Sequence, residues 1–551
     1  MNRDQRFING LTLLIACAML ASAAPPAWAL GIAPSQPVQR VRLTDEELQA
    51  IWGGCVWKGA AGANSDVVGN WIYHDSLCPN QKPVTGSTAW FSVDNGGTNT
   101  NCTWNSAGIT LVDFALGGNY TATVTLATNL TVSSSTATNG VRILSSGTLD
   151  AQSYSITIQQ AARFERTAGT FTAGTGTVVF NGNADQVLNS SHAFYNLTIN
   201  NTGSAGSDDI TLSTALTVNN NLTITDGDLT PGANAITVGG SLSIGASGSF
   251  DKTSFTGWTF SGTTKTIADS TAALQDLGAV TINGTYTANS NLWVTSLTIN
   301  AAKSLDLTNR ILYLENSGTP LAVNGTLTTT GSTVIYRGAS ATNVAGIAYH
   351  HLNLGGSGTT ATYTAAGNLT VGGVLTIVSS SGTNTFDASN KTITLSGSGT
   401  PFVISPTEVF TASTSTVKYT GDGAVTVAPA VYNNLELSPT ITASRAYTMG
   451  GKGTANLDII LLWDSADGAI PAGWTCVSCV SGDPFFRRFP RAASTYGGTG
   501  GASTVTHTVR FSGTTNTTGA LTSKEASGSS LAAKAHAHVA PPRSNVRIWG
   551  H

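Results

Sequence analysis

Charge is scarce in this sequence. Asp, Glu, Lys and Arg together make up 10% of the 551 residues, and the formal net charge is −3. Proteins that bind nucleic acid neutralise its phosphates with clustered Lys and Arg, so this composition excludes a nucleic-acid partner. Disordered chains of similar polarity carry more charge and fewer β-branched residues. Thr, Val and Ile instead recur at every second position, which is typical of β-strands.

Long apolar runs are missing after the N-terminal segment, where no stretch reaches the roughly 18 apolar residues of a membrane-spanning helix. The N-terminal segment itself has the parts of a signal peptide. Arg3 and Arg6 form a basic start, residues 11–24 are apolar, and an A-x-A cleavage site ends at Ala29. We therefore expect a secreted or cell-surface protein. The alternative for this segment is a lipobox with a lipidated Cys17.

Cysteine is rare, and outside the cytoplasm the few thiols can oxidise. Cys476 and Cys479 have the spacing of half a zinc ribbon, but no second pair follows them, which favours a local disulfide. Two of the three cysteines Cys55, Cys78 and Cys102 are expected to pair, and we assign the bond to Cys78 and Cys102. One cysteine is then left over.

A leader-like segment precedes the first domain. Residues 43–54 read LTDEELQAIWGG and predict a short amphipathic helix that ends at Gly53 and Gly54. Thr44 and Glu47 have the spacing of a capping box. The segment resembles the double-glycine leaders of peptide bacteriocins, which a peptidase-containing transporter cuts after the glycine pair. The resemblance implies processing after Gly54, and the alternative is a helix that only joins the signal peptide to the next domain.

From about residue 110 to 447 the sequence repeats with a period near 80 residues. A pattern with an aromatic residue occurs as TVVFNG at 177–182, WTFSG at 258–262, TVIYRG at 333–338 and TVKYTG at 416–421. A second pattern follows as FYNLTIN at 194–200, YHHLNL at 349–354 and VYNNLEL at 431–437. Between them lie short alternating segments bounded by Gly, Asn or Asp turns. The period indicates one structural unit in four copies.

Strict alternation places one face of each strand in a core and the other in water. Short strands at roughly 20-residue spacing, without helices, predict an all-β fold: a parallel β-solenoid whose coils stack on one another. Val, Ile and Leu fill its interior, and Thr, Ser and Asn cover its outside. The alternative fold is a string of β-sandwich domains of about 80 residues each.

The segment 55–110 differs from the repeat because it is rich in Trp and Cys. Trp57, the pair Asn70-Trp71 and the AWF sequence at 89–91 resemble the start of secreted β-helical adhesins of the autotransporter-passenger type. The resemblance implies a cap on the first coil. A solenoid needs such a cover because an open strand edge pairs with other chains.

The repeat pattern stops near residue 448. The last hundred residues contain, in order, IPAGW at 470–474, PFFRRF at 484–489, a Gly-rich turn at 497–501 and AHAH at 535–538. This order resembles the phage tail-collar and tail-fibre tip family, although T-H-T around His507 replaces the family's H-T-H. The resemblance implies a recognition or trimerisation module. Its candidate contacts to a ligand are Trp474 and the basic cluster of Arg487, Arg488 and Arg491, and the alternative for the cluster is a packed strand with solvated arginines.

His536 and His538 are candidates for a metal site. Two residues apart on a strand, both imidazoles point to the same side. Around the axis of a homotrimer, three such pairs would offer six nitrogens to a first-row transition ion. His507 is a further candidate ligand. The alternative is a set of exposed loop histidines.

Catalysis is not expected. β-Helical polysaccharide lyases and glycoside hydrolases gather two or three carboxylates on one face. Acids between 110 and 447 are sparse, and we expect no pair at equal positions of adjacent repeats. Asp208, Asp209, Asp226 and Asp228 lack the oxygen ligands of a full calcium loop and are interpreted as turn residues.

The sequence therefore predicts an exported structural or adhesive surface or fibre protein, with a β-helical carbohydrate-active enzyme as the alternative. The expected partner is an extracellular or cell-surface glycan or protein. The predicted parts are a signal peptide (1–29), a leader-like linker (30–54), a Trp/Cys-rich cap (55–110), a solenoid (111–447) and a tail-collar-like domain (448–551).

Overall fold

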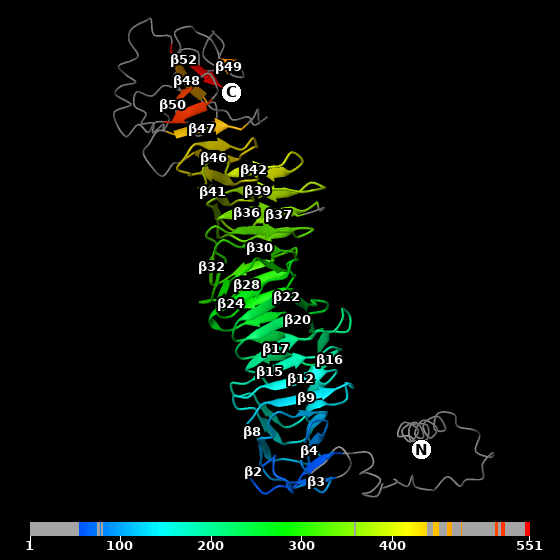
Figure 1. Ribbon diagram of the computed structural model, residues 1–551. Coiled ribbons are helices and arrows are strands. Elements are labelled where there is room, and N and C mark those ends of the chain that lie inside the picture. The colour runs from blue at the N-terminus through cyan, green and yellow to red at the C-terminus, as the bar shows by residue number, and fades with distance from the viewer. Residues whose placement is uncertain are drawn as a thin grey trace, which may run out of the picture. The chain divides into compact units, whose positions relative to one another are not determined.

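The computed structural model describes residues 54–73, 78, 81–356, 360–437 and 445–450, and beyond these the backbone of five short strands. Within these residues the protein is all-β, without an α-helix, and forms a parallel β-solenoid of about 16 turns. The predicted fold class is confirmed. Strands follow one another along the stack in the order of the sequence (Figure 1).

The strands form where apolar side chains alternate with Thr, Ser and Asn. In β17 (Asn196–Asn200), Leu197 and Ile199 are fully buried, while their neighbours are only partly buried. β30 (Ile311–Leu314) and β44 (Thr416–Tyr419) have the same alternation. β-Branched side chains suit such a half-buried pleated surface. The alternation therefore fixes which face of each strand closes the core.

Each coil turns between different sheets. The consecutive strands β27 (Leu292–Val294), β28 (Ser296–Ile299) and β29 (Ser304–Asp306) belong to three separate sheets. One coil later, each pairs in parallel with its own successor: β30, β31 (Leu321–Val323) and β32 (Thr326–Thr328). The chain thus winds around a single core, and strands one coil apart become neighbours.

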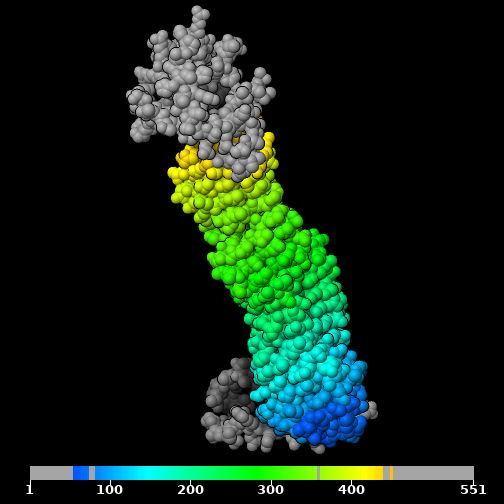
Figure 2. Space-filling model, turned by 90° about the vertical axis from the view of Figure 1, so that its left-hand side faces the viewer, coloured from blue at the N-terminus to red at the C-terminus, as the bar shows by residue number. Residues whose placement is uncertain are grey.

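Columns of aligned side chains run through the interior. Val334 lies on Leu352, Leu352 on Leu375 and Leu375 on Phe402, and all four are buried. Full burial of such a side chain contributes roughly 1.5–3 kcal/mol. The aligned pairs are unevenly spaced in sequence, so the turns absorb differences in coil length. Figure 2 shows the result as bands of colour that follow one another along the described residues.

The two sequence patterns of the repeat stack directly on each other. β15 (Thr177–Asn181) pairs with β17, β33 (Thr333–Tyr336) with β36 (His351–Leu354), and β44 with β46 (Asn434–Leu437). One repeat therefore spans several coils. The β-sandwich alternative is wrong, because every ladder from β4 to β46 in the described residues is parallel.

Hydrogen-bonded tyrosine pairs occupy the same place in two repeats; all of these side chains are buried except Tyr432, which is partly buried. The Tyr349 hydroxyl donates to the Ala345 carbonyl (2.7 Å), so the 2.9 Å contact between the two hydroxyls has Tyr336 as donor. Tyr336 in turn accepts from the Ala345 N–H at 3.1 Å. Burial raises the pKa of Tyr336 to about 12. The same contacts recur one repeat later in Tyr419, Tyr432 and Ala428.

The first coil ends in a strand of opposite direction. β1 (Cys55–Trp57) has the parallel β4 (Thr88–Ser92) on one side and the antiparallel β3 (Trp71–Tyr73) on the other. β4 pairs in parallel with β7 (Asp113–Gly117), so the stack already includes the Trp/Cys-rich segment. β3 therefore occupies the edge that β1 would otherwise expose.

An aromatic cluster fills this first coil. The Trp71 ring centroid lies 5.2 Å from that of Trp57, 5.5 Å from Phe91 and 6.3 Å from Trp104. All four side chains are almost fully buried, and the Trp71 indole donates to the Ser65 carbonyl at 2.7 Å. Edge-to-face aromatic pairs of this kind add to the stabilisation by burial.

Strand direction also changes after residue 445. β45 (Val425–Val427) pairs in parallel with β47 (Arg445–Met449), which pairs antiparallel with β51 (Ala520–Ser523). β51 also pairs with β50 (Gly513–Thr515). A separate antiparallel sheet joins β48 (Ile460–Asp464), β52 (Val546–Gly550) and β49 (Thr475–Cys476).

Candidate functional site

Most of the residues predicted to act at a site lie outside the described residues. These are Ala29, Gly53, Trp474, Cys479, Arg487, Arg488, Arg491, His507, His536 and His538. Gly54 begins the described part and Cys476 lies in β49, which is described as backbone. The processing, recognition and metal-site hypotheses and the Cys476–Cys479 disulfide therefore stay predictions.

The disulfide of the first coil joins Cys55 to Cys78, and Cys102 is a buried free thiol. The prediction that Cys78 pairs with Cys102 is wrong. Cys102 lies in β5 (Cys102–Trp104), where it stacks between Ala63 and Val124 in a different sheet from β1. Burial raises the pKa of its thiol. Sequence spacing did not reveal which side of the coil each cysteine occupies.

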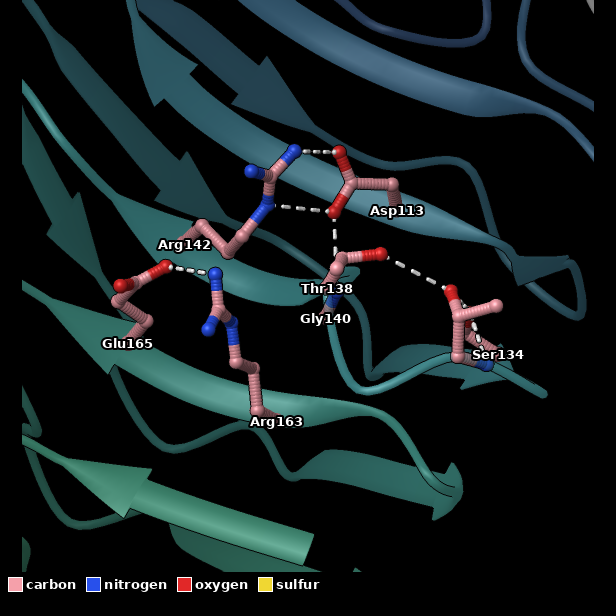
Figure 3. Close-up of polar contacts among 8 residues, drawn as sticks. Asp113, Ser134, Thr138, Gly140, Arg142, Arg163 and Glu165 are labelled. Carbon is pink, nitrogen blue, oxygen red and sulfur yellow. Dashed lines mark hydrogen bonds and ion pairs between the residues drawn. The ribbon is translucent and has the colours of Figure 1, made fainter. Parts of the chain in front are cut away.

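A buried ion pair links successive coils near the N-terminus (Figure 3). The Asp113 carboxylate accepts from Arg142 Nε at 2.9 Å, from Arg142 Nη2 at 2.5 Å and from the Gly140 N–H at 2.9 Å. Burial raises the pKa of Asp113, and the hydrogen bond and charge of Arg142 oppose that rise. A second pair joins Arg163 to Glu165 at 2.6 Å in the next coil.

Arg142 is also stacked on an aromatic ring. Its guanidinium carbon lies 5.1 Å from the ring centroid of Trp90. Ala115 occupies the aligned position between them, and its small side chain leaves room for the arginine to span two coils. The Arg142 guanidinium contacts both the Asp113 carboxylate and the Trp90 ring, which lie on other coils. We therefore assign Arg142 a role in stabilising the stack rather than in binding a ligand.

A similar cluster lies later in the stack. The Arg337 guanidinium carbon is 4.1 Å from the ring centroid of Tyr313 and 5.7 Å from that of Trp293. It also pairs with Glu315 at 3.0 Å. Arg337 covers the face of the Tyr313 ring, so a ligand cannot stack on that face. Both clusters of arginine and aromatic side chains are therefore interpreted as surface contacts that stabilise the stacking of successive coils.

A further surface feature consists of outward-facing threonines on successive coils, and it recurs along the described residues without a charged or aromatic side chain stacked over it. We define a threonine array as three strands on successive coils that present two outward columns of side chains. In the first array Thr123, Thr148 and Thr170 form one column, and Thr125, Asp150 and Thr172 form the other. The strands are β8 (Thr123–Leu126), β11 (Thr148–Asp150) and β14 (Thr170–Thr172). The middle residue of each triplet is buried.

Two further arrays have the same layout, with Asp in the middle strand of the second column. The second array uses β26 (Thr285–Ala288), β29 and β32, with the columns Thr285, Ser304, Thr326 and Thr287, Asp306, Thr328. The third uses β37 (Thr362–Ala365), β40 (Thr385–Asp387) and β43 (Val409–Thr411), with the columns Thr362, Thr385, Val409 and Thr364, Asp387, Thr411.

The remaining repeat carries acids at the corresponding place. Asp209 in β18 (Asp209–Leu212) and Asp228 in β20 (Leu222–Thr230) are aligned on adjacent coils, and Asp185 accepts from the Asp209 N–H at 3.3 Å. Burial, with the charges of Asp185, Asp228 and Asp208, raises the pKa of Asp209. The buried Ile210 and Leu229 set this register, which brings two acids together on adjacent coils of one repeat.

The sequence analysis missed the threonine arrays although a signal was present. The triplets TVT at 123–125, TYT at 285–287 and TYT at 362–364 recur in three of the four repeats. Their significance depends on alignment across coils, which sequence alone did not supply. Among the described residues, no three His, Cys, Asp or Glu side chains are arranged to hold a metal ion.

Comparison with known proteins adds no assignment. The chain matches no protein-family model, and searches of curated proteins and of solved structures found no similar protein. In the part of the chain that the structure describes, no helix has the length and apolar character to cross a membrane. The function is therefore argued from the coils and their outer surface.

Proposed function

We propose that this protein is an exported structural or adhesive protein of the cell surface or of a fibre. The observation that carries the proposal is the parallel stack of about 16 turns, in which each coil aligns its side chains with the next. Such a fold is a scaffold that presents the same kinds of side chain at regular intervals. The signal-peptide pattern at 1–29 supports export.

The proposal includes a recognition or trimerisation module at 448–551. It rests on the tail-collar resemblance, with Trp474 and the arginines at 487, 488 and 491 as contacts. His536 and His538, with His507, would hold a transition-metal ion on the axis of a homotrimer. Sedimentation of the full chain with and without a chelator tests this part. A monomer in both conditions overturns the trimer and its metal site.

Attachment is the test of the adhesive role. The full chain is produced with its N-terminal segment in a bacterial host, and intact cells are probed with an antibody and with added protease. We expect surface labelling, loss of the label after proteolysis, and greater retention of these cells on a glycan-coated or protein-coated support. A protein that stays inside the cell, or that leaves retention unchanged, overturns the proposal.

A carbohydrate-active enzyme is the second candidate, and the aligned acids Asp209 and Asp228 favour it. Glycoside hydrolases act with two carboxylates on one face, and Asp185 adds a third nearby. The test is release of reducing ends from polysaccharides by the full chain, compared with the Asp209→Asn, Asp228→Asn double variant. Turnover that the double variant loses would replace the scaffold proposal with an enzyme.

A further inference from the structure

The three threonine arrays are a regular two-column surface that recurs in three of the four repeats of the described solenoid. Adjacent coils are separated by about 4.8 Å, and outward residues two apart on a strand by roughly 6.6 Å. Each array therefore offers a lattice of three by two side chains with these spacings. The middle residue of each triplet is buried or, in Leu327 and Phe410, partly buried against the core. The lattice is therefore set by the core and does not depend on loops.

The hydroxyl groups of these arrays are free to bind a ligand. In the part of the chain that the structure describes, no protein group hydrogen-bonds the hydroxyls of Thr123, Thr125, Thr148, Thr170 or Thr172. The same holds for the threonines of the second and third arrays. Each Thr also presents a methyl group beside its hydroxyl. The surface can thus accept and donate hydrogen bonds and also pack against C–H groups.

The charge of the arrays restricts the ligand. None of their positions is Lys or Arg, and each array has one carboxylate, at Asp150, Asp306 or Asp387. Each carboxylate accepts a backbone N–H two residues ahead, at 3.1, 2.9 and 2.8 Å respectively. These acids therefore shape the turn that ends the strand. A polyanion would meet only negative charge here, so the arrays suit a neutral ligand.

We propose that the threonine arrays bind a neutral, linear, hydroxyl-rich polysaccharide that lies along the stack of coils. A polymer in this direction meets two outward side chains at every coil, most of them threonines. The proposal deepens the adhesive function and rests on it, because it names the chemical class that the scaffold would hold. The Asp209–Asp228 repeat is not included, since its outer surface is acidic.

Three arrays on one chain make the binding multivalent. A single array without an exposed aromatic ring offers only neutral hydrogen bonds and methyl contacts, each of which contributes little in water. A polymer long enough to contact two arrays gains from the high effective concentration of the second. We therefore expect long chains to bind much more tightly than their short oligosaccharides.

The experiment uses the full chain and three neutral polymers: cellulose, chitin and an unbranched soluble β-glucan. Alginate and polygalacturonate are the anionic controls. The test variant carries Thr125→Val, Thr287→Val and Thr364→Val, one in each array, which removes hydroxyls but keeps shape and β-propensity. The matched control carries Thr131→Val, Thr157→Val and Thr198→Val, at outward positions of other strands. Hydrogen exchange confirms that both variants keep their coils.

We expect the wild-type chain and the control variant to bind at least one neutral polymer and neither polyanion. The array variant should bind that neutral polymer with an affinity at least roughly tenfold lower. Equal binding by the array variant overturns the proposal, as does binding to none of the neutral polymers. A chain that still holds cells to a support in that case leaves the adhesive function intact. Release of reducing ends would instead overturn the adhesive function itself.

Discussion

The first coil and the middle of the repeat solve the same packing problem with different side chains. In the middle, a strand such as β36 has a parallel neighbour on both sides, and aliphatic columns with a few tyrosine pairs fill the core. The first coil has the stack on one side only. It contains four buried aromatic rings, a disulfide and the antiparallel β3. A terminal coil must supply its own stabilisation because its outer neighbour is absent.

The largest effect is expected for the core of the first coil. Trp71→Ala removes a ring that contacts Trp57, Phe91 and Trp104, and should destabilise this coil by about 3–5 kcal/mol. Hydrogen exchange should show faster exchange from β1 to β4 and unchanged protection beyond β15. The matched variant Leu352→Ala should act around β33 to β39 (Leu375–Ile377) instead. Uniform loss along the stack in either variant would remove the distinction between end and middle.

The disulfide comes next. Cys55→Ser with Cys78→Ser opens a loop of sequence separation 23 and should cost about 2–4 kcal/mol, because the unfolded segment gains freedom. Chemical unfolding in oxidising and reducing buffer measures it. Cys102→Ala is the control: it removes an unpaired thiol and keeps the Cys55–Cys78 bond, so reductant should lower its stability as much as it lowers that of the wild type. A reductant effect that persists in the double variant would contradict the assignment of this bond.

The tyrosine pairs should show a smaller effect in the middle of the stack. Tyr336→Phe leaves the Ala345 N–H without its acceptor and should cost about 1–3 kcal/mol, and Tyr419→Phe should do the same one repeat later. The free energy from local hydrogen exchange measures both. Equal values would show that the repeats are energetically equivalent. Two very different values would show that position along the stack matters even away from the ends.

The smallest effect concerns the acidic repeat. Burial and neighbouring acids raise the folded-state pKa of Asp209 above its unfolded value. The folded state then binds a proton more readily, so stability should rise as the pH falls through the folded pKa and decrease as the pH rises through it. Asp209→Asn should flatten this dependence in acid unfolding curves, and the exposed Asp66→Asn should not. An unchanged curve would show that the acids do not interact.

Local alternation was enough to predict the fold but not the outer surface. The alternation of apolar and polar residues predicts that Leu197 and Ile199 are buried, as they are. The recurrence of an aromatic residue at Phe180, Tyr336 and Tyr419 indicates repeated units. Alignment between coils is a different quantity, because it depends on how many residues each turn contains. The Asp209–Asp228 pair, the Cys55–Cys78 bond and the threonine arrays all depend on that alignment. The sequence analysis therefore missed all three.

The uneven spacing of aligned residues separates two quantities that are usually tied in proteins, chain length and physical extent. Val334 and Leu352 are 18 positions apart in sequence and Leu375 and Phe402 are 27 apart, yet the residues of each pair are aligned on adjacent coils. Insertions into turns therefore leave the rise per coil unchanged, whereas duplication of whole coils extends the ladder by about 4.8 Å each. Evolution can thus adjust the reach of such a chain in discrete steps while its loops vary freely.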